Sequence, residues 1–101
     1  ETVDLSGWWF IDDNPEDNAP YVFSDGTVLL PGMYLVREKD VHHTFGLGRQ
    51  DEVNLYNAAG ERIDATAWPR DGAAVSWCRI PNGVGAFQSC SAQTFGAPNV
   101  E

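Results

Sequence analysis

The stretch Glu52-Val53-Asn54-Leu55-Tyr56-Asn57-Ala58-Ala59-Gly60-Glu61-Arg62-Ile63-Asp64-Ala65-Thr66-Ala67 decides the fold class. Residues 53–56 and 62–66 are β-prone runs on either side of a turn, in which Gly60 can adopt the left-handed backbone that a hairpin corner needs. Apolar positions alternate with polar ones: Val53 and Leu55 share a face of the first run, and Ile63, Ala65 and Ala67 share a face of the second. This alternation is typical of a half-buried antiparallel sheet. We therefore expect a hairpin whose two apolar faces are the buried ones.

The rest of the chain repeats this pattern of short β-prone runs and turns. No window has the spacing of an amphipathic helix over three turns, whereas Gly, Pro, Asn and Asp recur between the apolar runs. Pro31-Gly32, for example, separates two of the expected strands. We expect strands at residues 5–11, 21–23, 27–30, 33–37, 53–56, 62–66, 77–80 and 87–89. Seven or eight short, mainly antiparallel strands predict an all-β sandwich or barrel.

Composition bounds the size and the class of partner. The chain has 101 residues, of which 43% are hydrophobic and 12% aromatic, which is the composition of one globular domain rather than of a disordered segment. Fifteen acidic and six basic residues give a net charge of −9. Such a charge disfavours binding to nucleic acid and to anionic membrane surfaces. The longest apolar runs are too short to cross a bilayer, so we expect no membrane insertion.

The two cysteines, Cys78 and Cys90, lie at equal distances on either side of Val84. The turn-forming Pro81-Asn82-Gly83 falls just before that midpoint, so a hairpin here would bring the two thiols face to face. We therefore expect a disulfide, and with it an oxidising compartment. The alternative is a pair of buried free thiols in a cytosolic protein.

Several strings in a fixed order resemble the bacterial type of lamin-tail domain. They are Asp4-Leu5-Ser6-Gly7-Trp8, Asp25-Gly26-Thr27-Val28-Leu29-Leu30-Pro31-Gly32-Met33-Tyr34-Leu35-Val36, Asp51-Glu52-Val53-Asn54-Leu55-Tyr56, Gly60 followed by Ile63-Asp64, and Thr94-Phe95-Gly96-Ala97-Pro98-Asn99. The order holds from about residue 3 to residue 99. The resemblance implies an immunoglobulin-like β-sandwich over residues 1–101 with no catalysis of its own. Such modules accompany secreted or surface proteins, often beside nucleases, phosphatases or other hydrolases.

The chain departs from the pattern of that family near its start. The family has a strand or two before the Leu-Ser-Gly-Trp string, where this sequence has only Glu1-Thr2-Val3. We therefore expect a domain that is truncated at its N-terminus or completed by another segment. Trp9 and Ile11 occupy positions that the family leaves polar and outward, which makes them candidate partner contacts. A protein partner or a second copy would pair with an open strand edge running from Leu5 to Ile11.

An acidic run follows these residues and is the candidate metal site. Asp12, Asp13, Glu16 and Asp17 offer carboxylate oxygens, the ligands that Ca²⁺ prefers. The run lacks the spacing of an EF-hand loop and has no glycine to turn its ligands inward, so a solvated loop is the competing interpretation. Adjacent His42 and His43 would point to opposite faces of a strand, so we expect them not to share a metal ion. No other cofactor is expected.

These observations favour a binding domain over an enzyme. No serine lies in the Gly-x-Ser-x-Gly turn that exposes a nucleophile, and both cysteines are expected to be oxidised. Trp8 and Trp77 fit core positions, whereas Trp9 does not. We expect a non-catalytic binding or assembly module of a secreted or cell-surface protein. The alternatives are a structural spacer beside a catalytic domain and a calcium-dependent binder of glycans or surfaces.

Overall fold

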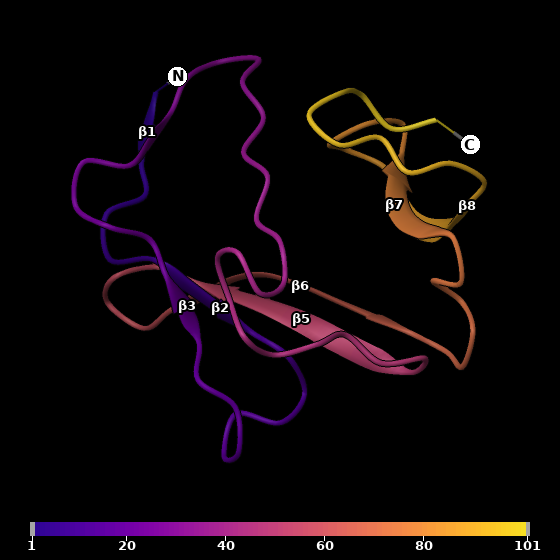
Figure 1. Ribbon diagram of the computed structural model, residues 1–101. Helices are drawn as coiled ribbons and strands as arrows, with labels where there is room; N and C mark the ends of the chain where they lie inside the picture. The colour runs from indigo at the N-terminus through magenta and orange to yellow at the C-terminus, as the bar shows by residue number, and fades with distance from the viewer. Residues whose placement is uncertain (1, 101) are drawn as a thin grey trace.

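The hairpin expected from residues 52–67 lies at the centre of a computed structural model, which describes residues 2–100 (Figure 1). Its strands are β5 (Asp51–Tyr56) and β6 (Arg62–Trp68), paired antiparallel with a register shift at Leu55/Tyr56. The Asn57 carboxamide oxygen accepts hydrogen bonds from the backbone N–H groups of Ala59 (3.0 Å) and Glu61 (2.9 Å). Gly60 has a φ of 84°, the left-handed conformation that the turn requires. The turn thus forms as expected.

The register of β5 and β6 corrects the expected faces of this hairpin. Val53 lies opposite Thr66, and Asn54 lies opposite Ala65. Directly opposed residues share a face, so the apolar residues of the two strands point to opposite sides of the sheet. Ala65 and Ala67 are exposed, as is Ile63, which retains 50% of its surface. The expectation that residues 63, 65 and 67 form a buried face is wrong.

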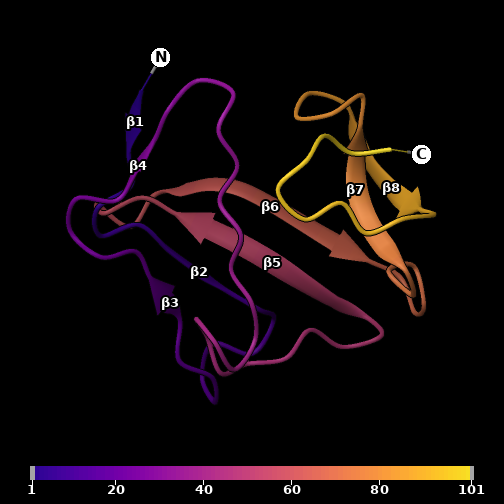
Figure 2. The same cartoon turned by 45° about the horizontal axis from the view of Figure 1, so that its top comes forward.

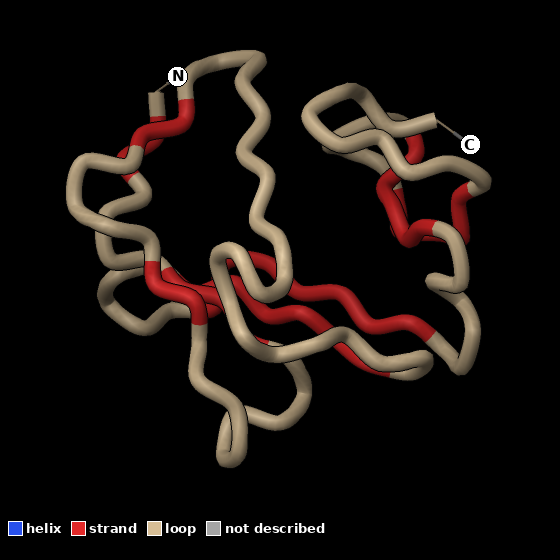
Figure 3. Tube along the Cα trace, viewed as in Figure 1, coloured by secondary structure: helices blue, strands red, loops and turns tan. Residues whose placement is uncertain are grey.

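The described residues contain eight strands in three sheets, joined by turns and loops, and none of these residues is helical (Figure 3). The largest sheet has the order β3-β2-β5-β6, with β2 at Trp9–Ile11 and β3 at Tyr21–Val22. β1 (Val3–Asp4) pairs with β4 (Val28–Leu29), and β7 (Ser76–Ile80) pairs with β8 (Ala86–Cys90). Every strand pair is antiparallel. The all-β class is confirmed, and the arrangement is consistent with a β-sandwich (Figure 2).

The strand edge expected to be open near the N-terminus is paired. β2 lies between β3 and β5, so both of its edges carry a neighbouring strand. Before it, the N–H of Leu5 donates to Thr27 O (2.8 Å) and that of Gly7 to Phe23 O (3.0 Å). The prediction of an open edge from Leu5 to Ile11 is therefore wrong. The outer strands of this sheet are β3 and β6.

The core lies on the side of the largest sheet that carries Phe10. The Phe10 ring packs against Tyr21, Phe23, His43 and Phe45, with ring centroids 5.3–6.0 Å apart. The buried apolar residues are Leu5, Ile11, Phe23, Phe45, Trp68, Cys78 and Cys90. Ile11 lies on the opposite face, with Trp9, but it is only 2% exposed, so the expectation that it is open to a partner is wrong. Trp8 and Trp77 are half-buried rather than fully enclosed.

Residues 33–37, expected as a strand, are extended but unpaired. The N–H of Met33 bonds back to Leu30 O, and residues 34–37 make no backbone–backbone hydrogen bond within the described part of the chain. In Figure 2 the connection that contains this segment leads from β4 and passes in front of β5. The expected strand is therefore not formed, because it has no paired neighbour within residues 2–100.

The hairpin of β7 and β8 carries the Cys78–Cys90 disulfide, as expected. The two cysteines are diagonal neighbours rather than directly opposed, because Cys78 faces Gln88 and Ser76 faces Cys90. Their Cα atoms are 6.1 Å apart. Disulfides persist mainly in oxidising compartments, so the bond points to an extracytoplasmic location. No helix within residues 2–100 has the length and apolar character needed to cross a membrane.

Reduction of the disulfide should destabilise the fold. The bond closes a loop with a sequence separation of 12 residues. The chain-entropy model gives about 2–3 kcal/mol for a loop of this size. Chemical denaturation of the oxidised and the reduced protein should therefore differ by that free energy of unfolding. Two thiols that alkylate freely in the native, unreduced protein would contradict the bond.

Candidate functional site

The face of the largest sheet opposite Phe10 carries a stacked aromatic pair. Pairing of β2 with β5 places Trp9 directly opposite Tyr56. Their ring centroids are 4.1 Å apart, and their planes meet at 11°. Both side chains are half-buried, so part of this stack meets solvent. Of the two predicted contact residues, Trp9 thus stays at the surface, whereas Ile11 forms the floor beneath it.

A cavity of about 480 Å³ opens beside this stack. We call this cavity and the residues that line it the β2–β5 face. The lining residues are Trp9, Ile11, Asp12, Asp13, Pro15, Glu52, Asn54, Tyr56, Gly60 and Arg62. Glu52 accepts a hydrogen bond from the Asn54 carboxamide at 2.7 Å, which fixes both side chains. The cavity therefore combines aromatic rings with three carboxylates and one guanidinium.

Asp12 organises the loop that borders this cavity. Its side chain is 4% exposed, and it accepts hydrogen bonds from Asn14 N (3.1 Å) and from the Asn18 carboxamide (2.7 Å). The Asp17 carboxylate makes no bond to Asp12 but accepts a hydrogen bond from the Asn14 carboxamide at 3.2 Å. The acidic run is thus a closed loop held by amide donors.

Asp51 joins the acidic run from a position 38 residues further along the chain. Its carboxylate accepts N–H bonds from Gly48 (2.7 Å), Glu52 (2.8 Å) and Asp13 (3.3 Å). Burial acts to raise the pKa of Asp51, but these N–H donors outweigh it and lower the pKa below the ordinary value. A hydrogen bond to the Asp51 side chain raises the pKa of Asp13, and repulsion by Asp51, Asp12 and Glu52 adds to the shift.

The candidate metal ligands are therefore only partly those expected. Carboxylate oxygens of Asp12, Asp13 and Asp51 lie within 4.8 Å of one another, whereas Glu16 and Asp17 do not belong to this cluster. The sequence did not point to Asp51, because Asp51 lies 38 residues from Asp13 in the chain. The pairing of β2 with β5 brings the two residues together. Since Asp12 and Asp51 already accept two and three hydrogen bonds, few of their lone pairs are free for a cation that takes roughly six to eight oxygen ligands.

The two adjacent histidines make different contacts. Nδ1 of His42 accepts the N–H of Glu38 at 3.0 Å. The His43 ring instead stacks on Phe45, with ring centroids 4.5 Å apart. Neither belongs to a cluster of metal-ligating side chains among the described residues.

Comparison with known proteins gives no match: no protein-family model, no curated protein and no solved structure is significantly similar to this chain. The resemblance to lamin-tail domains therefore stays a prediction that rests on the quoted strings.

Removal of the Asp13 charge should stabilise the protein at neutral pH. A carboxyl with a raised pKa in the folded state favours folding below its unfolded pKa, and this contribution is lost as the pH rises through the folded pKa. At about pH 7 the ionised Asp13 thus works against the fold, so Asp13→Asn should raise the Tm more at about pH 7 than at about pH 3.

Asp17→Asn is the matched control for this measurement, because Asp17 is exposed and bonds only to Asn14 among the described residues. Thermal unfolding of both variants at the two pH values makes the comparison. Equal gains for the two variants, or a gain for Asp13→Asn that does not depend on pH, would contradict the assigned proximity of Asp13 and Asp51.

Proposed function

We propose that this chain is a non-catalytic binding module of a secreted or cell-surface protein and that it takes a cationic segment of a protein partner on the β2–β5 face. The observation that carries the proposal is the partly exposed Trp9–Tyr56 stack bordered by carboxylates. An exposed stack of this kind offers a rigid contact surface at low entropic cost, and Trp and Tyr are enriched at the centres of protein interfaces.

The charged side chains that line the cavity indicate the chemistry of the partner. Asp12, Asp13 and Glu52 line the cavity against the single cation Arg62, in a chain whose net charge is −9. A lysine or arginine side chain from a partner would be attracted to the carboxylates and to the faces of the two rings. The same cation would reduce the repulsion by Asp51, Asp12 and Glu52, which adds to the effect of the Asp51 hydrogen bond on the pKa of Asp13.

The disulfide and the sequence resemblance support the proposed location and the accessory role of the module. Cys78–Cys90 is typical of a domain that works in an oxidising compartment, which supports secretion or surface display. The lamin-tail resemblance supports an immunoglobulin-like domain that serves as an accessory to another part of its protein. Of these two arguments, the resemblance favours recognition over catalysis, whereas the disulfide concerns the compartment alone.

The aspartate cluster favours one competing function, calcium-dependent binding of a glycan. Asp12, Asp13 and Asp51 lie close enough to share an ion, beside aromatic rings on which a sugar could stack. The hydrogen bonds already made by Asp12 and Asp51 weigh against it. The partner-binding function is therefore the one that the geometry supports best.

Calorimetric titration with a lysine- and arginine-rich peptide tests the proposal. Binding should weaken with salt, and Trp9→Ser or Glu52→Gln should each reduce the affinity by about tenfold, as expected for a central aromatic contact or a charge-assisted hydrogen bond. Asp25→Asn is the control for charge, since Asp25 lies in an exposed turn and does not line this cavity. It should leave the affinity unchanged.

Three results would contradict this function. Equal losses for Asp25→Asn and Glu52→Gln would mean that only net charge matters. Binding of neutral oligosaccharides that requires Ca²⁺, with none of the cationic peptide, would favour the glycan binder. A lack of binding to either probe would favour a structural spacer.

A further inference from the structure

Asn82, in the turn between β7 and β8, is the only asparagine of the chain that is followed by glycine. The other five asparagines precede Pro15, Ala19, Leu55, Ala58 and Val100. The backbone nitrogen after an asparagine can attack the side-chain carboxamide carbon, because the chain holds the two atoms close enough to close a five-membered ring. A side chain on the attacking residue hinders this approach, and proline has no N–H to lose, whereas glycine leaves the path open. The sequence therefore has one preferred position for this reaction.

The Gly83 nitrogen is free to attack. Residues 81–84 are exposed, and the turn is closed without Gly83, because Pro81 O accepts the N–H groups of Val84 (3.2 Å) and Gly85 (2.9 Å). The N–H of Gly83 makes no hydrogen bond with any described residue. The φ of Gly83 is 76°, a conformation that glycine adopts without steric cost. The attacking atom is thus held in a fixed turn and has no bond to break.

The two Asp-Gly pairs of the chain, which could close the same ring, lack this freedom. In Asp25-Gly26 the glycine N–H donates to Ser6 Oγ at 2.8 Å, and in Asp71-Gly72 it donates to Pro69 O at 2.8 Å. A carboxylate is also a poorer electrophile than a carboxamide, because its negative charge repels an electron-rich nitrogen. The structure therefore favours Asn82 over both aspartates.

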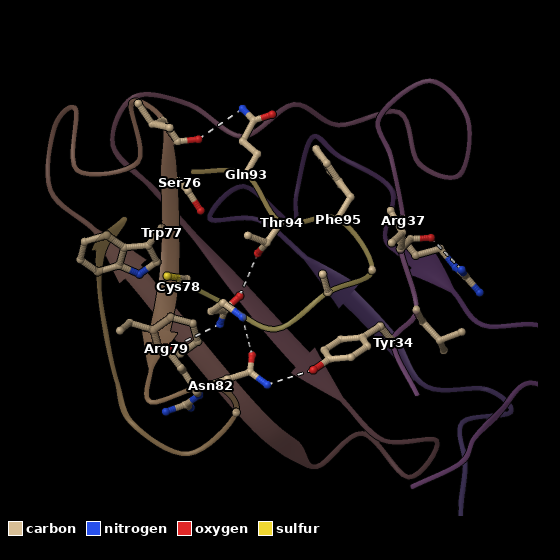
Figure 4. A pocket seen from close by; sticks show the side chains of 18 residues that line it. Tyr34, Arg37, Ser76, Trp77, Cys78, Arg79, Asn82, Gln93, Thr94 and Phe95 are labelled. Atoms are coloured by element: carbon tan, nitrogen blue, oxygen red, sulfur yellow. Dashed lines mark hydrogen bonds between the residues drawn. The ribbon is translucent and has the colours of Figure 1, made fainter. Parts of the chain in front are cut away.

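The Asn82 carboxamide is held at both of its polar atoms, and it lines a cavity of about 620 Å³ between β7 and residues 34–37 (Figure 4). The backbone N–H of Asn99 donates to Asn82 Oδ1 at 2.9 Å. Asn82 Nδ2 donates to the Tyr34 hydroxyl at 3.0 Å, and Figure 4 shows these two side chains pointing toward each other. Asn99 is itself anchored to β7, because its carboxamide donates to Arg79 O at 3.0 Å.

Each of these two contacts acts on an atom whose charge changes in the reaction. Attack on the carboxamide carbon places negative charge on Oδ1, and the N–H of Asn99 stabilises that charge. The departing Nδ2 must gain a proton, and the Tyr34 hydroxyl is an O–H donor within hydrogen-bond distance of it. The hydroxyl accepts from the planar amide before the reaction and donates to the nitrogen once that nitrogen becomes basic. The contacts therefore activate the carboxamide.

We infer that Asn82 is a site of spontaneous self-modification, at which the chain closes a succinimide ring between Asn82 and Gly83. The bond from Gly83 N to Asn82 Cγ forms, and the bond from Cγ to Nδ2 breaks. Gly83 N gives its proton to water, and Nδ2 leaves as ammonia with the proton of the Tyr34 hydroxyl, which water then replaces. A second water opens the ring at either carbonyl and leaves aspartate or isoaspartate at position 82. Water is the only other reactant.

The products weaken the contacts that join the β7–β8 turn to its neighbours. The succinimide and the carboxylates that follow it have no N–H with which to donate to the Tyr34 hydroxyl. Isoaspartate also adds a methylene group to the backbone of the turn, which moves its side-chain oxygens away from the N–H of Asn99. The modification thus releases residues 34–37 and the C-terminal segment from the turn.

Peptide mass mapping after incubation of the folded protein at mildly alkaline pH tests the inference. The peptide that contains Asn82 should gain about 1 Da, because an amide nitrogen is exchanged for oxygen, and should contain isoaspartate. Asp25, Asp71 and Asn57 should stay unmodified over the same period. In the modified protein, amide hydrogen exchange at Asn99 should be faster, whereas exchange at Asn54 should not change.

Tyr34→Phe separates activation by the fold from the reactivity of an isolated Asn-Gly pair. In the folded protein it should slow the reaction at least about threefold, because the proton donor is lost. The two proteins should react at equal rates when denaturant unfolds them. Asn82→Gln, whose larger ring closes more slowly, is the control that should stay unmodified. Tyr34 is 42% exposed, so the phenylalanine variant should keep the fold, which thermal unfolding checks. An intact Asn82, an equal or higher rate in folded Tyr34→Phe, or earlier modification at Asp25 or Asp71 would overturn the inference.

Discussion

The register of β5 against β6 is the constraint on which the rest of the structure depends. A strand has a side-chain period of two, so a slip of one residue would exchange its core face for its solvent face. The observed register sets Val53 against Thr66 and leaves Asn54 and Tyr56 on the other side of the sheet. β2 pairs with the other edge of β5, and its register places Phe10 opposite Leu55 and Trp9 opposite Tyr56. This register turns Phe10 to the core and Trp9 to the surface.

This arrangement gives the molecule two surfaces of different character. On one side of the largest sheet, aromatic rings and carboxylates suit a cation. On the other side lies an apolar space, lined in part by Trp77 and Phe87, that continues into a cavity between β7 and residues 34–37. We propose that the first of these surfaces binds a cationic segment of a partner protein.

Local patterns predicted much of the fold, and long-range pairing accounts for what they missed. The turn at Gly60, the all-β class and the bond between Cys78 and Cys90 follow from neighbouring residues, so the sequence was sufficient for them. Ile11 is buried on the same face that leaves Trp9 half-exposed, and such burial depends on how distant segments pack, which no local pattern encodes. The approach of Asp51 to Asp13 is likewise set by the pairing of β2 with β5. Residues 33–37 have the composition of a strand, but they pair with no strand among residues 2–100.

The most direct test of this account is the register itself, measured by nuclear Overhauser contacts in solution. We expect contacts between the backbones of Val53 and Thr66 and between those of Asn54 and Ala65, together with ring contacts between Trp9 and Tyr56. A slip of one residue would instead pair Val53 with Ala65 or Ala67 and would bury Ile63. Those contacts would contradict the assignment of both surfaces.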